Sequence, residues 1–288
     1  MAHLRSRLAI YVALTRLNRP IGIFLLLWPT LTGLWIAAGG WPGWHLLLVF
    51  SLGTVLTRSA GCILNDLADR HFDGHVKRTV DRPLVTGKID PLEALFLAAG
   101  ILFMALLLVL TTNLFTVGLA AAAAAITAIY PFMKRHTYVP QAILGLAFSM
   151  GILMAFTAVT GEIASVAWLL LIANLLWVVA YDTEYAMVDR DDDLKLGLKS
   201  TAILFADLDR LMIGILQAST LLTLYLASRS TGLEIAWYLG LAGAAGLFGY
   251  QQWLIRERQR DACFRAFLNN HWVGLSIFAG AIVHYALI

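Results

Sequence analysis

Nine apolar runs dominate this sequence, and each is long enough to cross a bilayer as an α-helix. The hydrocarbon core is about 30 Å thick and takes roughly 20 helical residues. Hydrophobic residues make up 60% of the 288-residue chain and charged residues 14%, too few to cover a water-soluble globule. We therefore expect an all-α integral membrane protein with one domain over residues 1–288. The runs lie near residues 20–40, 45–64, 91–110, 114–133, 139–159, 164–185, 211–228, 233–253 and 270–287.

The lysines and arginines predict the orientation of these nine spans. Positively charged loops remain on the cytoplasmic side of a membrane. All 21 basic residues except Arg58 and Arg229 lie before the first run or in alternate loops after it. We expect a multi-pass membrane protein with the N-terminus in the cytoplasm and the C-terminus on the opposite side. The net charge of +3 reflects this bias, so no nucleic-acid partner is expected.

A first row of polar side chains follows the second run. If that helix continues toward the cytoplasm, Asn65, Asp69 and Asp73 recur at i, i+4 and i+8 and share one face. Carboxylates one turn apart repel each other on a bare helix. A divalent cation with oxygen ligands would remove this repulsion. The spacing therefore indicates a cation site at the cytoplasmic end of the span.

A second acidic row follows the sixth run, in "YDTEYAMVDRDDDLKLGLKSTAILF", residues 181–205. Asp182, Asp189 and Asp193 are spaced by seven and four, which again places them on one helical face. Four crossings separate the two rows, so both emerge on the same side of the membrane. Carboxylate rows flanked by lysine and arginine favour Mg²⁺ that bridges carboxylate and phosphate oxygens. The expected ligand is a diphosphate.

Polar residues also occur inside the apolar runs. Arg58 precedes Asn65 by seven residues on roughly the same face, and a charge within the membrane usually marks a functional cavity. Two structural alternatives remain open for Arg58, namely extension toward the interface or an ion pair with Asp182. Three other residues are expected to form hydrogen bonds between helices rather than to bind ligand: Asn174, Gln217 and His284.

Two extended motifs resemble those of a known family. Asn65-Asp66-x-x-Asp69-x-x-x-Asp73 resembles the first aspartate-rich motif of the UbiA superfamily of intramembrane prenyltransferases, and Asp189-x-x-x-Asp193 resembles the second. More narrowly, "NDLADRHFDGHVKRTVDRPL" and the 181–205 segment are similar to the 4-hydroxybenzoate polyprenyltransferases of ubiquinone biosynthesis. The resemblance extends over the whole chain and implies nine transmembrane helices around a central polar cavity. That cavity would open to the cytoplasm and laterally to lipid.

The resemblance also implies a reaction and a site. In this family, aspartate-bound Mg²⁺ holds the diphosphate of a polyprenyl diphosphate, and the polyprenyl group moves to position 3 of 4-hydroxybenzoate, ortho to the hydroxyl, as diphosphate leaves. Lys134 and Arg135 match a basic element that helps to neutralise the diphosphate. The residues implied as metal ligands are Asn65, Asp69, Asp73, Asp189 and Asp193. The residues expected to act in catalysis are Asp69, Asp73, Asp189, Asp193 and Arg135.

The acceptor and the reaction class leave alternatives open. Arg58 is the first candidate for the acceptor carboxylate, and Arg16 and Arg70 are weaker ones. Another ring could be the acceptor, as in haem, menaquinone or tocopherol-type prenylation. A cation channel or ion-coupled transporter is disfavoured because the acidic residues crowd one face of the membrane. The residues expected to contact substrates are Arg58, Lys134, Arg135, Asn65, Asp182 and Arg70.

Overall fold

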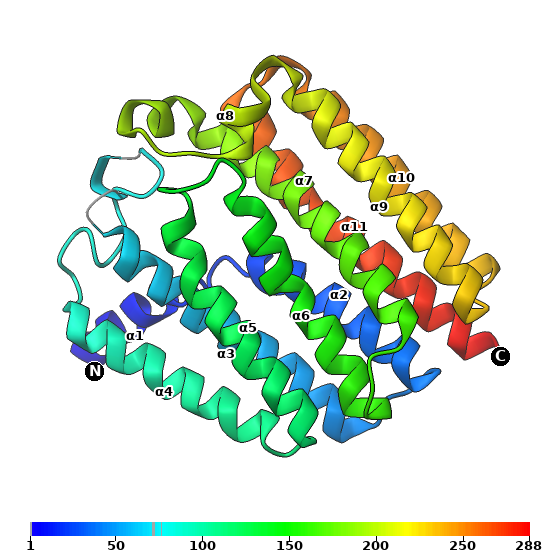
Figure 1. Ribbon diagram of the computed structural model, residues 1–288. Helices are drawn as coiled ribbons and strands as arrows, with labels where there is room; N and C mark the ends of the chain where they lie inside the picture. The colour runs from blue at the N-terminus through cyan, green and yellow to red at the C-terminus, as the bar shows by residue number, and fades with distance from the viewer. Residues whose placement is uncertain (1, 71–72, 76) are drawn as a thin grey trace.

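The computed structural model describes residues 2–70, 73–75 and 77–288, and this part of the chain is helical, as expected (Figure 1). Three short 3₁₀ segments join the α-helices: η1 (Asp73–His75), η2 (Ala206–Leu208) and η3 (Ile255–Glu257). The α-helices are α1 (Ala2–Leu14), α2 (Ile21–Ala38), α3 (Trp44–Asp69), α4 (Pro91–Val109), α5 (Leu114–Met133), α6 (Pro140–Thr160), α7 (Ser165–Leu196), α8 (Thr201–Phe205), α9 (Asp209–Thr231), α10 (Ile235–Leu254) and α11 (Arg260–Leu287).

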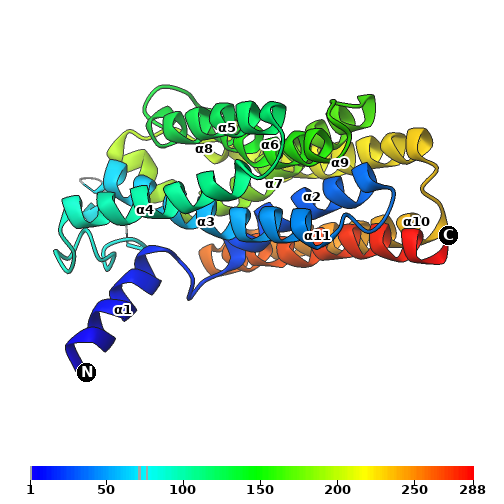
Figure 2. The ribbon, with the colours of Figure 1, turned by 90° about the horizontal axis from the view of Figure 1, so that it is seen from below.

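The long helices form a bundle closed by its last member. Neighbours in sequence pack against each other, and α11 then packs against both α2 and α7, so the two ends of the helical series meet. Figure 1 shows α7 and α11 in the middle of the bundle, with α9 and α10 along one edge. Helix α1 projects away from the bundle at an angle (Figure 2). The N-terminal basic segment therefore begins with a helix that the apolar runs did not predict.

Eight segments in the described ranges are long and apolar enough to cross a membrane. The predicted run at 233–253 corresponds to α10, which is not among the eight. Glycine, tyrosine, tryptophan and two glutamines dilute the aliphatic residues of this 20-residue helix. The protein is thus a multi-helix membrane protein, and the count of nine spans stays a prediction.

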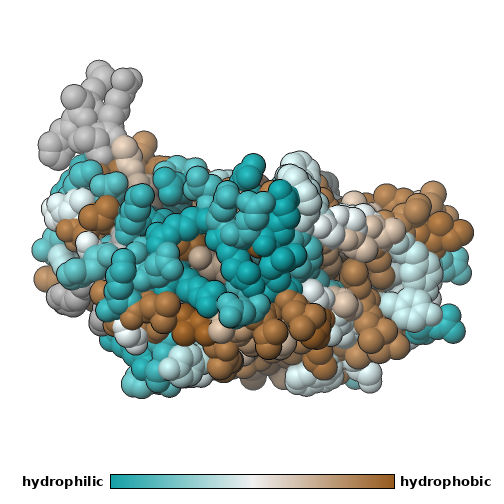
Figure 3. Space-filling view, turned by 90° about the horizontal axis from the view of Figure 1, so that it is seen from above, coloured by the Kyte–Doolittle hydropathy of each residue, from teal (hydrophilic) through white to brown (hydrophobic). Residues whose placement is uncertain are grey.

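Helices α3 and α7 are longer than their predicted spans. They contain 26 and 32 residues, which correspond to about 39 and 48 Å at 1.5 Å per residue. Both lengths exceed the roughly 30 Å of hydrocarbon, so the helices extend into the polar zone. Gly197, at φ 67°, then ends α7 with a left-handed residue. Hydrophilic residues gather in the view onto the α8 side of the molecule (Figure 3).

The hydrophobic core lies among α6, α7, α9, α10 and α11, with Trp177 and Trp237 almost fully buried within it. In contrast, α4 and α5 present large apolar side chains outward, including Phe96 and Leu114, which are 75% and 86% exposed. Such outward apolar faces fit contact with lipid tails.

Two of the predicted hydrogen bonds between helices are confirmed. Asn174 Nδ2 donates to Ser149 Oγ at 2.9 Å, and Gln217 Nε2 donates to Gln251 Oε1 at 2.9 Å. His284 instead accepts, at Nδ1, a 3.4 Å hydrogen bond from the backbone N–H of Glu234, in the turn before α10.

The α10–α11 contact depends on two facing glycines. A Cβ at Gly240 would lie 2.7 Å from the carbonyl oxygen of Ser276 and 3.2 Å from Cα of Gly280. Small residues at such crossings allow helix backbones to approach closely.

We expect Gly240→Ala to force the helices apart and destabilise the protein by about 1–3 kcal/mol, measured as a lower unfolding temperature in detergent. Gly246→Ala, on the same helix with open space around it, is the control and should not lower that temperature.

Candidate functional site

The second acidic row lies on a single helix, whereas the first does not. Asp182, Asp189 and Asp193 all belong to α7, so the predicted second row lies on one continuous helix. The prediction for the first row is wrong at Asp73. Helix α3 ends at Asp69, and Asp73 begins the 3₁₀ segment η1 instead of continuing the helix by one turn.

Contacts to residues further along the loop explain where Asp73 lies. Its carboxylate accepts a hydrogen bond from Arg82 Nη1 at 2.6 Å, and its carbonyl oxygen accepts one from Thr79 Oγ1 at 2.7 Å. The same Arg82 nitrogen lies 2.9 Å from Asp66 on α3. Arg82 therefore holds η1 against the end of α3. Burial raises the pKa of the Asp73 carboxyl above its ordinary value, and the Arg82 guanidinium partly opposes this shift.

Asp69 faces the loop between α5 and α6. Lys134 Nζ lies 2.6 Å from Asp69 Oδ2, and Arg135 Nη2 lies 3.8 Å from Asp69 Oδ1. Arg135 also donates a hydrogen bond to the Ala68 carbonyl oxygen at 3.0 Å. The structure thus brings the predicted basic pair, Lys134 and Arg135, directly to the first acidic row.

The second row contacts the loop that follows α3. Arg78 Nη2 lies 2.6 Å from Asp189 Oδ2, and the Arg78 guanidinium lies over the ring of Tyr185 at 4.6 Å. The backbone N–H of Lys199 donates to the carbonyl oxygen of Lys134 at 2.9 Å. The segment after α7 therefore meets the loop that supplies the partner of Asp69. Asp193 lies within the electrostatic influence of Asp189, Lys134 and Arg78, so the two rows form one charged site.

Three arginines of this site were not predicted in their observed roles. Arg78 and Arg82 pair with Asp189 and Asp73, and their only signal in the sequence was the basic composition of the loop after residue 76. Arg16, a weaker candidate for an acceptor carboxylate, pairs with Asp66 at 2.8 Å. Two predicted residues lie nearby: Asn65 is partly buried one turn before Asp69, and Arg70 is exposed at the end of α3.

Arg58 lies deeper along α3. Its Nη1 donates to Cys62 Sγ at 3.1 Å, and its guanidinium lies 5.7 Å from the Phe148 ring centroid. Nε is buried and has no hydrogen-bond partner among the described residues. Gly22 leaves the space for this side chain, because a Cβ there would lie 2.5 Å from Arg58 Nε. Within the described ranges, Arg58 and Asp182 do not form an ion pair, although their charges interact.

The carboxylates are suited to a cation that is shared with a phosphorylated ligand. In the described part of the chain, no three His, Cys, Asp or Glu side chains lie together as ligands for one metal. Mg²⁺, however, commonly takes one or two carboxylates and completes its shell with phosphates and water. Among the described residues, Asp69 Oδ1 is buried without a hydrogen-bond partner, which leaves an acceptor available for such an ion. The oxygen-only ligand set therefore fits Mg²⁺.

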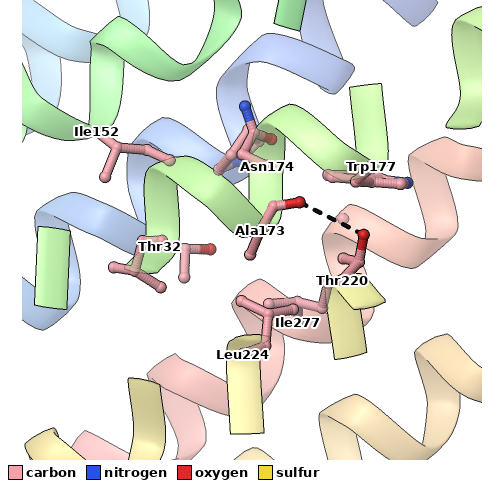
Figure 4. A pocket seen from close by; sticks show the side chains of 11 residues that line it. Thr32, Ile152, Ala173, Asn174, Trp177, Thr220, Leu224 and Ile277 are labelled. Carbon is pink, nitrogen blue, oxygen red and sulfur yellow. Dashed lines mark hydrogen bonds between the residues drawn. The ribbon is translucent and has the colours of Figure 1, made fainter. Parts of the chain in front are cut away.

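A separate cavity between the helices is too small to be the substrate site. It has a volume of about 30 Å³ and is lined by residues of α2, α6, α7, α9 and α11 (Figure 4). The Thr220 hydroxyl donates to the Ala173 carbonyl oxygen at 3.4 Å beside it. A cavity of this size accommodates about one water molecule. The charged site at the ends of α3 and α7 is therefore the candidate functional site.

An apolar helical bundle with paired acidic and basic groups at one end defines a membrane protein suited to a lipid-soluble substrate with a phosphorylated head. Sequence comparison identifies the family: the profile of the UbiA prenyltransferase family matches residues 26–274, and the chain belongs to this family.

Known relatives share most of this sequence. The chain is 58% identical to the 4-hydroxybenzoate octaprenyltransferase of Pseudomonas aeruginosa, over 100% of this chain and 97% of that protein. It is 57% identical to the protein of the same name from Alkalilimnicola ehrlichii, over 98% and 96% of the two chains.

Solved structures share the fold. A UbiA homologue from Aeropyrum pernix K1 has 24% identity and a TM-score of 0.81, over 91% of this chain and 97% of that chain. A homologue from Archaeoglobus fulgidus bound to GPP and Mg²⁺ has 19% identity and a TM-score of 0.71, over 95% and 99%. These similarities support the membrane-prenyltransferase fold predicted from the sequence.

Proposed function

We propose that this protein transfers a polyprenyl group from a polyprenyl diphosphate to position 3 of 4-hydroxybenzoate, with release of diphosphate, in ubiquinone biosynthesis. The observation that carries this proposal is the full-length identity of 58% with a protein named 4-hydroxybenzoate octaprenyltransferase. The charged site supplies the chemistry that this reaction needs. Residues 1–288 would act as one catalytic domain.

The diphosphate would bind between the two acidic rows. Asn65, Asp69, Asp73, Asp189 and Asp193 would hold Mg²⁺, and the bound ion would supply positive charge that neutralises the diphosphate oxygens. Lys134 pairs with Asp69 and Arg78 pairs with Asp189. When these carboxylates serve as metal ligands, the ammonium and guanidinium groups become available to donate hydrogen bonds to the diphosphate. Arg135 lies next to Lys134 and would add a further donor.

The bond that breaks joins donor C1 to a diphosphate oxygen, and the leaving diphosphate keeps the electron pair. The lysine and arginine donors stabilise the negative charge that develops on this oxygen. The allylic cation that remains forms a bond from C1 to the ring carbon ortho to the acceptor hydroxyl. The ring then loses the proton from that carbon. Apolar walls that exclude water protect the cation from hydrolysis.

The carboxylate of 4-hydroxybenzoate would bind Arg58. This guanidinium is held in place by Cys62 and Phe148 and retains donor capacity, because Nε has no hydrogen-bond partner in the described ranges. Tyr130, Tyr181 and Tyr185 lie near this guanidinium, and their rings would enclose the acceptor. Asp182 would complete the acceptor site on the α7 side.

The donor's isoprenoid tail would remain in the lipid of a bacterial inner membrane while its diphosphate reaches the charged site at the ends of α3 and α7. The basic residues of the site lie in loops that the positive-inside rule assigns to the cytoplasm. The N-terminus would then face the cytoplasm and the C-terminus the opposite side. In this orientation both the diphosphate product and 4-hydroxybenzoate exchange with the cytoplasm.

Removal of the metal or of either acidic row should stop the reaction. We expect EDTA to abolish prenylation of radiolabelled 4-hydroxybenzoate by the purified protein, and Mg²⁺ to restore it. Asp69→Ala and Asp189→Ala should each lower kcat at least about a hundredfold, because the leaving group loses charge stabilisation. Asp81→Ala removes an exposed carboxylate from the loop between α3 and α4 and is the control. Full activity of both site variants would contradict the assigned metal site, whereas prenylation of a different ring would contradict the acceptor.

Arg58 should determine acceptor affinity rather than donor affinity. We expect Arg58→Gln to raise KM for 4-hydroxybenzoate about tenfold or more, because a charge-assisted hydrogen bond is lost, and to leave KM for the donor unchanged. Gly22→Ala should act in the same direction by displacing the guanidinium. Gly53→Ala, on α3 in open space, is the matched control. Equal effects on both substrates would indicate that Arg58 only supports the fold.

A further inference from the structure

A groove lies outside the charged site, between the start of α9 and the end of α10. Its volume is about 600 Å³. Two arginines and an aspartate occupy its polar rim, namely Arg210, Arg258 and Asp207, and residues of α9 such as Leu211 and Ile215 line its apolar wall. The combination of a charged rim and an apolar wall matches the two parts of a phospholipid.

A buried ion-pair network builds the rim. Asp209 is fully buried, and its carboxylate contacts Arg258 at 2.8 Å and Arg190 at 3.3 Å. Arg258 Nη2 also donates to the Asp207 carbonyl oxygen at 2.7 Å. These bonds fix the positions of the rim residues and compensate the charge of Asp209. Two guanidiniums on this one carboxylate leave the network with one net positive charge, to which Arg210 adds a second and the Asp207 side chain adds a negative charge.

Arg210 can hold a phosphate. Its Nη1 makes a 3.3 Å bond to the Arg256 carbonyl oxygen, whereas its Nε is buried without a hydrogen-bond partner among the described residues. An unsatisfied guanidinium N–H is costly, and reorientation of the partly exposed Arg210 side chain toward the groove would let a phosphate oxygen accept its hydrogen bonds. Arg210 also lies in the first turn of the 23-residue helix α9, where the helix dipole favours an anion.

The Asp207 side chain adds a negative charge to the otherwise basic rim. Its side chain is exposed, lines the groove and forms no ion pair with the residues that the structure describes. A carboxylate at this position repels a purely anionic headgroup but attracts an ammonium group. A headgroup that carries both a phosphate diester and a primary ammonium complements both Arg210 and Asp207.

The surroundings of the groove fit the membrane interface. Leu211 and Ile215 are 58% and 49% exposed, as expected for side chains that face acyl chains. On α10, Tyr250 stacks on Trp253 at 5.9 Å, and the Arg256 guanidinium lies 4.4 Å from the Trp253 ring. Aromatic and basic side chains of this kind concentrate at the level of lipid headgroups. A lipid bound in the groove would have its headgroup at the rim and a tail along α9.

We propose that this groove is a binding site for phosphatidylethanolamine, in which Arg210 binds the phosphate and Asp207 binds the ammonium. The site is distinct from the prenyl-transfer site and does not depend on the proposed reaction. Its occupant would connect the start of α9 to the end of α10.

Native mass spectrometry of the full-length protein, incubated with equal amounts of phosphatidylethanolamine, phosphatidylglycerol and phosphatidylcholine, tests this proposal. We expect the wild type to retain phosphatidylethanolamine preferentially. Arg210→Gln should reduce this adduct about tenfold, because a charge-assisted bond to phosphate is lost. Asp207→Asn should lower phosphatidylethanolamine binding to the level of phosphatidylglycerol without lowering the latter. Arg229→Gln, an exposed arginine at the other end of α9, is the matched control and should bind as the wild type does.

Three outcomes would overturn the proposal. They are equal retention of the three lipids by the wild type, unchanged retention after Arg210→Gln, and an unchanged lipid preference after Asp207→Asn. Thermal unfolding of each variant shows whether a loss of binding reflects a loss of fold. If Arg210→Gln unfolds, Arg210→Lys, which keeps the charge, should retain the lipid preference, and its failure to do so in a folded protein would also count against the site.

Discussion

The pairing of buried carboxylates with cations at one end of the bundle is the interaction on which the site depends. Asp66 and Asp69 are 2% and 3% exposed, and an unpaired charge at such positions costs several kcal/mol. Their partners Arg16, Arg82 and Lys134 come from three segments far apart in the sequence. Each segment is therefore held at the end of α3 because the buried carboxylates require its charge.

The same pairing affects which ligands the site can accept. An anion alone would draw Lys134 and Arg78 away from Asp69 and Asp189 and would leave these carboxylates unpaired. A divalent cation alone would compete with cations that are already in place. In the proposed reaction, a diphosphate that arrives together with Mg²⁺ would satisfy both sets of charges at once. We infer that the two ligands bind cooperatively, and that the ion pairs between rows and loops keep the site ordered before they arrive.

The sequence predicted those features that follow from local periodicity and hydropathy. The spacing of Asp182, Asp189 and Asp193 was sufficient because α7 runs without interruption until Gly197. The same argument failed at Asp73, which is held by tertiary contacts within its loop rather than by the continuation of α3. Pairs such as Arg78 with Asp189 join residues 111 positions apart, and periodicity contains no information about them. The glycines and glutamines of α10 likewise make the eighth predicted run, 233–253, too polar to be identified as a span by composition alone.

The length of α3 separates the two halves of the proposed chemistry. Arg58 precedes Asp69 by about three turns, or roughly 16 Å along the helix axis. A phenolic acid held by its carboxylate at Arg58 can point its ring toward the charged end, where the donor's diphosphate would be bound. The allylic carbon would then lie between a polar zone that stabilises the leaving group and an apolar zone, near Phe148, that excludes water. A single helix that continues past the hydrocarbon boundary can thus position both reactants.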